Sequence, residues 1–248
     1  MFASLEQRGF AVKSIEKFGH DARYPVTNNW PYLIDQLADF VRPLIEQSGE
    51  KAYLVGHSLG GIISTMCAAQ HPDLARAVVL LDSPVIGGWK ATALKAAKAS
   101  GMVSKISLGK ISQRRTQVWP SEQAAYDSFK SKRAFALWED AVLRDYIAHG
   151  TYTGDDGKRN LSFNRAVETQ IYNTLPDNLP SLLRRKPLLA PAAFIGGLQS
   201  EELKRTGTAL TEQFTQGRMS WIDGTHLFPM EKPLATAAFI ENAITAMR

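Results

Sequence analysis

A nine-residue stretch, Tyr53-Leu54-Val55-Gly56-His57-Ser58-Leu59-Gly60-Gly61, constrains the fold more than any other part of the chain. Three apolar residues lead directly into a serine that has a glycine two positions away on each side. A segment typical of a helix, 62–70, follows at once. This order predicts a sharp turn between a strand and a helix, with Ser58 in a strained backbone conformation. We expect Gly56 and Gly60 to be required because larger side chains would collide with neighbouring strands.

The residues around this turn predict an α/β fold. Residues 10–16 alternate between apolar and polar side chains, which favours a strand, and 29–47 carry apolar residues at helical spacing. Residues 52–55 and 77–81 are short apolar runs bounded by turn residues, typical of buried strands. Strands that alternate with helices in this way predict a mostly parallel sheet flanked by helices on both faces.

The alternation breaks at Gly87-Gly88 and resumes at Leu188. The residues between these points have helical character, interrupted by turn signals such as Asp155-Asp156-Gly157. We therefore expect an α/β core, 1–87 and 187–248, with a helical cap insertion, 88–186, between its halves. The second half of the core is predicted to contain a strand at 188–195, a helix at 200–214, a strand at 219–222 and a helix at 234–247.

Composition argues against several classes of protein. The 248 residues carry a net charge of only +5, with no basic tail and no zinc-like spacing of Cys and His, so we expect neither nucleic-acid binding nor a metal or other cofactor. The single cysteine, Cys67, cannot form an internal disulfide, which favours a reducing compartment. The first residues, MFASLEQRGF, do not resemble a signal peptide, and no stretch is long enough to span a membrane. A cytoplasmic location is expected.

Ser58 needs partners if it is to act as a nucleophile, because a serine hydroxyl reacts poorly until a base removes its proton. His226 follows the last predicted core strand, and the carboxyl ends of parallel strands share one edge of the sheet, so His226 is the predicted base. The amide of Leu59, at the start of a helix, can donate to a developing oxyanion. His20 and His57 are predicted to line the substrate pocket, with the side chain of His57 directed away from Ser58.

A carboxylate is needed to orient the histidine. Asp82 ends the strand that follows the serine turn and helix, at the same sheet edge, and is the favoured candidate, although Asp82-Ser83-Pro84 is also a common turn sequence. Glu201 and Glu202, after the strand at 188–195, remain the alternative, although both also suit the first turn of a helix.

These motifs together resemble the α/β-hydrolase superfamily, in its capped, serine esterase-like branch. The resemblance is carried by GHSLGG (56–61), AVVLLDSP (77–84), DGTHLFP (223–229) and GHD (19–21). The order Ser58, Asp82, His226 is similar to the family's order of nucleophile, acid and histidine. The resemblance implies hydrolysis of a carboxylic ester or related acyl compound through an acyl-enzyme, with a small-molecule acyl substrate.

Two features depart from the family pattern. Most members carry the acid in a Gly-x-x-Asp sequence, where this chain has Gly197-Leu198-Gln199-Ser200, and some members carry it one strand earlier, at the position of Asp82. Members also begin with further strands and a His-Gly loop that supplies a second oxyanion amide. We therefore expect an N-terminally truncated chain. It would lack the strand that the family places between the strands matching 10–16 and 52–55, so these two strands would either leave a gap in the sheet or pair directly.

Residues 90–119 contain seven Lys and Arg, no acidic residue, and interleaved apolar side chains. This pattern favours a solvated helix whose apolar face covers the site, and it is also compatible with anionic or acyl-chain substrates or with contact to an anionic membrane surface. Trp89, Trp119, Phe135 and Trp138 either line an acyl pocket or pack the insertion. The alternatives to a serine hydrolase are a non-enzymatic or catalytically impaired binding protein on the same fold, and an acyltransferase.

Overall fold

A four-stranded parallel sheet is built from both ends of the chain in the computed structural model, which describes residues 1–86, 88–99 and 112–248. The strand order is β1 (Ala52–His57), β2 (Ala75–Leu81), β6 (Ala192–Gly197) and β7 (Met219–Ile222), and every neighbouring pair is parallel. The prediction of a mostly parallel sheet is therefore confirmed. Since β2 and β6 are hydrogen-bonded neighbours, the residues before position 87 and after position 186 share one sheet.

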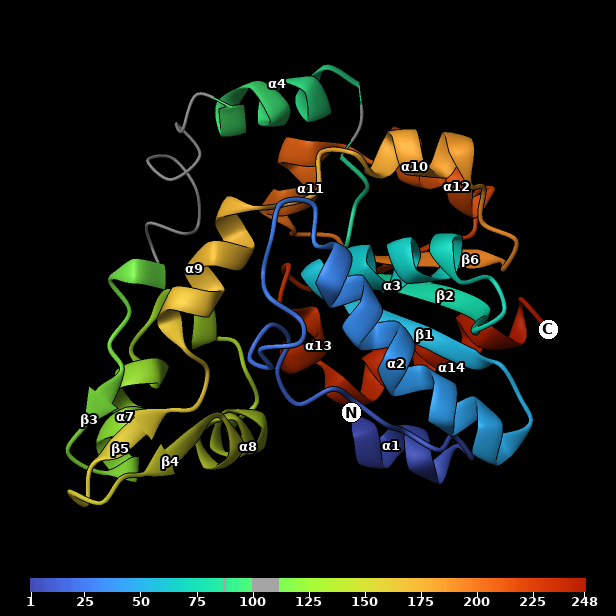
Figure 1. Ribbon diagram of the computed structural model, residues 1–248. Helices are drawn as coiled ribbons and strands as arrows, with labels where there is room; N and C mark the ends of the chain where they lie inside the picture. Colours follow the sequence, from blue (N-terminus) through green and yellow to red (C-terminus); the bar gives the residue numbers. More distant parts are fainter. Residues whose placement is uncertain (87, 100–111) are drawn as a thin grey trace.

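Helices cover both faces of this sheet (Figure 1). On one face lie α2 (Pro31–Ser48) and α3 (Leu59–Gln70), and on the other lie α1 (Phe2–Gln7) and α14 (Pro233–Thr245). Three shorter helices follow β6 and β7: α11 (Glu201–Thr206), α12 (Ala209–Thr215) and α13 (Phe228–Glu231). The single helix predicted at 200–214 is in fact two helices, because Gly207 adopts a left-handed φ of +77° between them.

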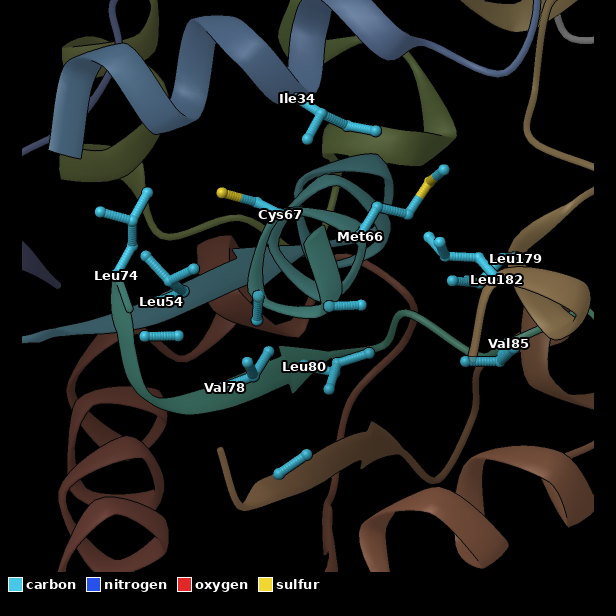
Figure 2. Packing of buried hydrophobic residues seen from close by; sticks show 14 of the residues in the cluster. Ile34, Leu54, Met66, Cys67, Leu74, Val78, Leu80, Val85, Leu179 and Leu182 are labelled. Atoms are coloured by element: carbon cyan, nitrogen blue, oxygen red, sulfur yellow. The ribbon is translucent and has the colours of Figure 1, made fainter. Parts of the chain in front are cut away.

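The side chains of β2 show why its sequence is an uninterrupted apolar run. Val78 and Leu80 pack into the cluster formed with α2 and α3, whereas Val79 and Leu81 pack into the cluster formed with α1 and α14. Figure 2 shows Val78 and Leu80 on the side of β2 that faces α3. Successive side chains of a strand point to opposite faces, so a strand covered on both faces must be apolar at every position.

Residues 10–16 do not form the strand that their alternating pattern predicts. They carry no ladder bonds to a neighbouring strand, and β1 lies at one edge of the described sheet. Phe10 and Val12 instead pack beside the cluster between the sheet and the helices α1 and α14, and the Phe10 amide donates to the Leu5 carbonyl. The alternation of apolar and polar residues reflects burial of one side of this segment. A strand also requires hydrogen bonds to a neighbouring strand, and residues 10–16 do not pair directly with β1.

The intervening segment, residues 88–186, contains a second, antiparallel sheet in the order β3 (Val118–Trp119), β5 (Arg159–Leu161) and β4 (Thr151–Thr153). The segment therefore combines helices, as its sequence predicts, with three short strands that were not predicted. The β4–β5 hairpin closes through bonds from the Gly154 amide to the Lys158 carbonyl and from the Gly157 amide to the Gly154 carbonyl. The helices are α4 (Gly88–Ala99), α7 (Glu122–Lys130), the 3-10 turn η1 (Arg133–Phe135), α8 (Asp140–Gly150), α9 (Arg165–Asn173) and α10 (Leu179–Arg185).

Three of the four aromatic residues singled out in this segment pack together. Trp119 and Trp138 are buried in one cluster, and Phe135 packs against it with its ring 4.6 Å from that of Trp138. The side chain of Trp89 and much of the basic run, residues 100–111, lie outside the described residues. Across the described parts of the chain, no helix is both long enough and apolar enough to cross a membrane.

Candidate active site

Ser58 occupies the turn between β1 and α3 with φ 52° and ψ −119°, a strained conformation for a residue with a side chain. Gly56 is required there, because a Cβ at this position would lie 2.3 Å from the backbone carbon and oxygen of Gly60. The expectation for Gly60 is wrong, since a Cβ there meets nothing within 4 Å. The second crowded position is Gly61, whose added Cβ would lie 2.5 Å from the Ser83 hydroxyl.

Ser58, His226 and Asp82 form a continuous chain of hydrogen-bonding contacts. The Oγ atom of Ser58 lies 3.1 Å from Nε2 of His226, and Nδ1 of His226 lies 2.6 Å from Oδ2 of Asp82. Asp82 is fully buried, whereas the side chain of His226 is 19% exposed. The sheet register explains part of this proximity: His57 pairs with Leu81, so Ser58 and Asp82 leave neighbouring strands at the same level.

Asp82 receives two further hydrogen bonds that sequence reasoning missed. The Gly197 amide donates to Oδ1 at 2.7 Å, and the Ser200 hydroxyl donates to Oδ2 at 2.5 Å. With His226, three donors therefore satisfy this buried carboxylate, as buried charges require. Ser200 occupies the position where the family pattern has its acid. This position was the sequence feature that could have indicated a contact between Ser200 and Asp82.

The two alternative glutamates do not bond to His226. Glu201 is exposed and pairs with Lys204 at 2.6 Å. Glu202 is exposed, and one of its oxygens lies within 4.8 Å of ligand atoms of both Asp82 and His226, without a hydrogen bond to either. Among the described residues, Asp82 is the carboxylate that contacts the imidazole. The three residues could offer ligand atoms to a cation, but the acid and the histidine are already hydrogen-bonded to each other.

The loop that carries His226 is braced from two sides. The His57 ring donates through Nε2 to the His226 carbonyl at 2.7 Å, and burial, followed by the nearby His226, lowers the pKa of His57 to about 4. The His57 ring is therefore neutral near pH 7 and acts as a hydrogen-bond donor. On the other side, the Thr225 amide donates to Oε2 of Glu231 at 3.0 Å. Both contacts fix the backbone on which the imidazole stands.

His20 and His57, the two predicted pocket residues, both make bracing contacts. Nε2 of His20 accepts from the Asn164 amide at 2.9 Å, Nδ1 lies 2.9 Å from the Phe18 carbonyl, and the ring packs against Phe163. His20 therefore connects the loop after residue 16 to the intervening segment. Neither histidine is among the residues that line the cavity beside Leu59.

That cavity, of about 360 Å³, has Leu59, the residue after Ser58, among its lining residues. Leu59 is also the first residue of α3, where the amides of a helix have no partner within the helix and attract negative charge. Its apolar lining residues include Leu59, Leu161, Phe163 and Ile171. A group of polar residues from the intervening segment, here called its polar end, comprises Arg115, Tyr146, Glu168 and Tyr172, and Glu16, Lys17, His149 and Ser162 also line the cavity.

The chain belongs to the α/β-hydrolase fold family, whose profile matches residues 9–233. A serine hydrolase-like protein of Dictyostelium discoideum is 23% identical over 98% of this chain and 68% of that protein. The 2-(acetamidomethylene)succinate hydrolase of Mesorhizobium japonicum is 34% identical, but over only 40% of this chain and 32% of the enzyme.

Solved structures show the same fold. The crystal structure of E-2-(acetamidomethylene)succinate hydrolase matches with a TM-score of 0.68 and 24% identity, over 92% of this chain and 78% of that one. A peroxisomal α/β-hydrolase of Saccharomyces cerevisiae matches with a TM-score of 0.66 and 16% identity, over 89% of this chain and 60% of that one. The predicted fold class and family are thus confirmed.

Proposed function

We propose that this protein is a serine hydrolase that cleaves a carboxylic ester or related acyl compound through an acyl-enzyme intermediate. The observation that carries the proposal is the hydrogen-bonded chain from Ser58 through His226 to the buried carboxylate of Asp82. Such a chain supplies what a serine hydroxyl lacks, namely a base within reach and an acid that holds the base in the correct tautomer.

The proposed reaction proceeds in two halves. His226 Nε2 takes the proton of Ser58 Oγ as that oxygen attacks the acyl carbon, and the amide of Leu59 donates to the oxyanion. The imidazolium then gives its proton to the leaving alcohol, which departs and leaves an ester on Ser58. Water attacks that ester with His226 again as the base, which releases the acid and restores the serine. Transfer to a second alcohol instead of water would make the protein an acyltransferase.

We also propose that residues 88–186 form a cap over this site and that its substrate is a small acyl compound. Support comes from the cavity beside Leu59, which side chains of this segment line, and whose volume of about 360 Å³ suits a small molecule. Buried Cys67 cannot form an internal disulfide, so we propose a cytoplasmic location, which cell fractionation tests.

A fluorophosphonate probe tests the proposed function, because it phosphonylates a serine only where a neighbouring base activates it. We expect wild-type protein to be labelled at Ser58 and Ser58→Ala to be unlabelled, with hydrolysis of short-chain 4-nitrophenyl esters lost in parallel. Ser48→Ala, at the exposed end of α2, is the matched control and should behave like wild type. A folded wild-type protein that neither reacts nor hydrolyses would favour the binding protein instead.

A further inference from the structure

The polar end of the cavity beside Leu59 is a cluster of four side chains. Glu168 and Tyr172 lie one turn apart on α9, Tyr146 lies on α8, and Arg115 precedes β3. A guanidinium nitrogen (NH1) of Arg115 lies 3.0 Å from Oε1 of Glu168. The remaining guanidinium donors and both phenol hydroxyls have no hydrogen-bond partner among the described residues. The cluster therefore contains several donors that these residues leave without a partner.

The same cluster also contains an acceptor that has no partner. Only 14% of the Glu168 side chain is exposed. Its Oε2 atom is buried and has no hydrogen-bond partner in the part of the chain that the structure describes. Burial raises the pKa of Glu168 in spite of the nearby Arg115. Buried polar atoms in folded proteins are nearly always hydrogen-bonded, so an oxygen in this state in a cavity wall favours a ligand that brings a donor.

Different acyl groups satisfy this cluster to different degrees. A hydrocarbon chain would leave Oε2 of Glu168 and the donors of Arg115 without partners. A carboxylate would bind the guanidinium, but it would bring no donor and would place a second negative charge beside Glu168. An amide offers both an N–H for Glu168 and a carbonyl oxygen for Arg115 or a tyrosine hydroxyl.

We propose that the cavity beside Leu59 binds an acyl group that carries an amide, with the amide N–H donating to Oε2 of Glu168 and its carbonyl accepting from Arg115. The assignment to the acyl side of the substrate rests on the proposed function, in which the Leu59 amide binds the acyl oxygen. Glu168 and Arg115 are then the residues that determine specificity.

Two methyl esters that differ by one group provide the test. N-acetylglycine methyl ester carries an amide N–H where levulinic acid methyl ester carries a CH₂, and the two are otherwise alike in length and shape. Both are titrated into Ser58→Ala protein and followed by ligand-observed NMR, which needs no turnover. Because a hydrogen bond to a charged group is worth about tenfold or more in affinity, we expect the amide ester to bind about tenfold more tightly.

Variants connect this preference to Glu168. In Glu168→Gln, Arg115 retains the side-chain oxygen, so the amide NH₂ faces the cavity and the preference for N-acetylglycine methyl ester should disappear. Glu139→Gln, at the exposed start of α8, is the matched control and should keep the preference. If Glu168→Gln does not fold, Arg115→Gln gives the second test, since it removes the proposed donor to the amide carbonyl and should weaken binding of both esters.

Several outcomes would overturn the proposal. Equal binding of the two esters to Ser58→Ala protein would do so, and so would a preference that survives Glu168→Gln. Tighter binding of monomethyl succinate would make the cluster a carboxylate site instead. Because this binding does not depend on reaction at Ser58, a protein that fluorophosphonate does not label but that prefers the amide ester would refute the proposed function and retain this inference.

Discussion

Replacing Asp82 by asparagine tests the acid with the smallest possible change of shape. The wild-type carboxylate faces three donors: the Gly197 amide, the Ser200 hydroxyl and Nδ1–H of His226. Asparagine has one accepting oxygen, and its NH₂ group must face a donor in either orientation. If the oxygen stays with Gly197, the NH₂ group meets His226. The imidazole can accept from it only in the tautomer that carries its proton on Nε2.

That tautomer cannot take the proton of Ser58, whose Oγ lies 3.1 Å from Nε2. We therefore expect kcat to fall by about 10⁴, the size of effect that a wrong tautomer produces in a serine–histidine–aspartate site. Stability should fall as well, because hydrogen bonds to a charged group contribute about 1.5–3 kcal/mol each. Since the new NH₂ group can still donate to Ser200, we expect a net loss of roughly 2–4 kcal/mol.

Steady-state hydrolysis of a short-chain 4-nitrophenyl ester measures kcat and KM, and thermal unfolding followed by circular dichroism measures stability. Glu201→Gln and Glu202→Gln are the matched controls, because both glutamates are exposed and neither bonds to His226. We expect each control to stay within about twofold of wild type, as surface substitutions usually do. The reasoning is refuted if folded Asp82→Asn retains near-normal kcat, or if Glu202→Gln is the variant that loses activity.

Two further predictions concern the turn and its histidine. Gly56→Ala should destabilise the protein by about 3 kcal/mol or more, because its Cβ would lie 2.3 Å from Gly60 backbone atoms. Gly60→Ala should be neutral or stabilising by up to about 1 kcal/mol, because a Cβ at that position meets open space. Equal thermal shifts in the two variants would contradict this. The folded-state pKa of His57, about 4, lies below its ordinary value of 6.5. Between these pH values His57 is protonated in the unfolded chain but not in the folded one, so the stability of the protein falls as pH drops from 6.5 to 4. Urea unfolding of the wild type should show a loss of about 3 kcal/mol of stability over this window, and His57→Gln should not show this loss. Identical pH profiles of stability in the two proteins would contradict the prediction.

The serine turn and its partners could be predicted from the sequence because local features determine them. Gly56 and Ser58 follow an apolar run and precede a helix, and parallel strands bring Asp82 and His226 to the same edge. The contact of Ser200 with Asp82 could not be predicted, because it depends on the path of the chain after β6 and on the rotamer of one hydroxyl.

The errors elsewhere have two physical causes. Residues 10–16 have the alternation of a strand, but pairing depends on which segment lies alongside, and that information is not local. The sheet of β3, β4 and β5 was missed because its strands are two or three residues long, too short to show a period. The turn residues Asp155, Asp156 and Gly157 nevertheless indicated the position of the turn that joins β4 and β5.

The pairing of His57 with Leu81 has a consequence for how this protein can diverge. Ser58 and Asp82 belong to a single strand–helix–strand unit, 52–82, so their separation is set within about thirty consecutive residues by rules for parallel strand pairs. Residues 88–186 contribute neither of them. Insertions, deletions or replacement of that segment can therefore change the lining of the cavity beside Leu59 while the spacing of Ser58 and Asp82 stays constant.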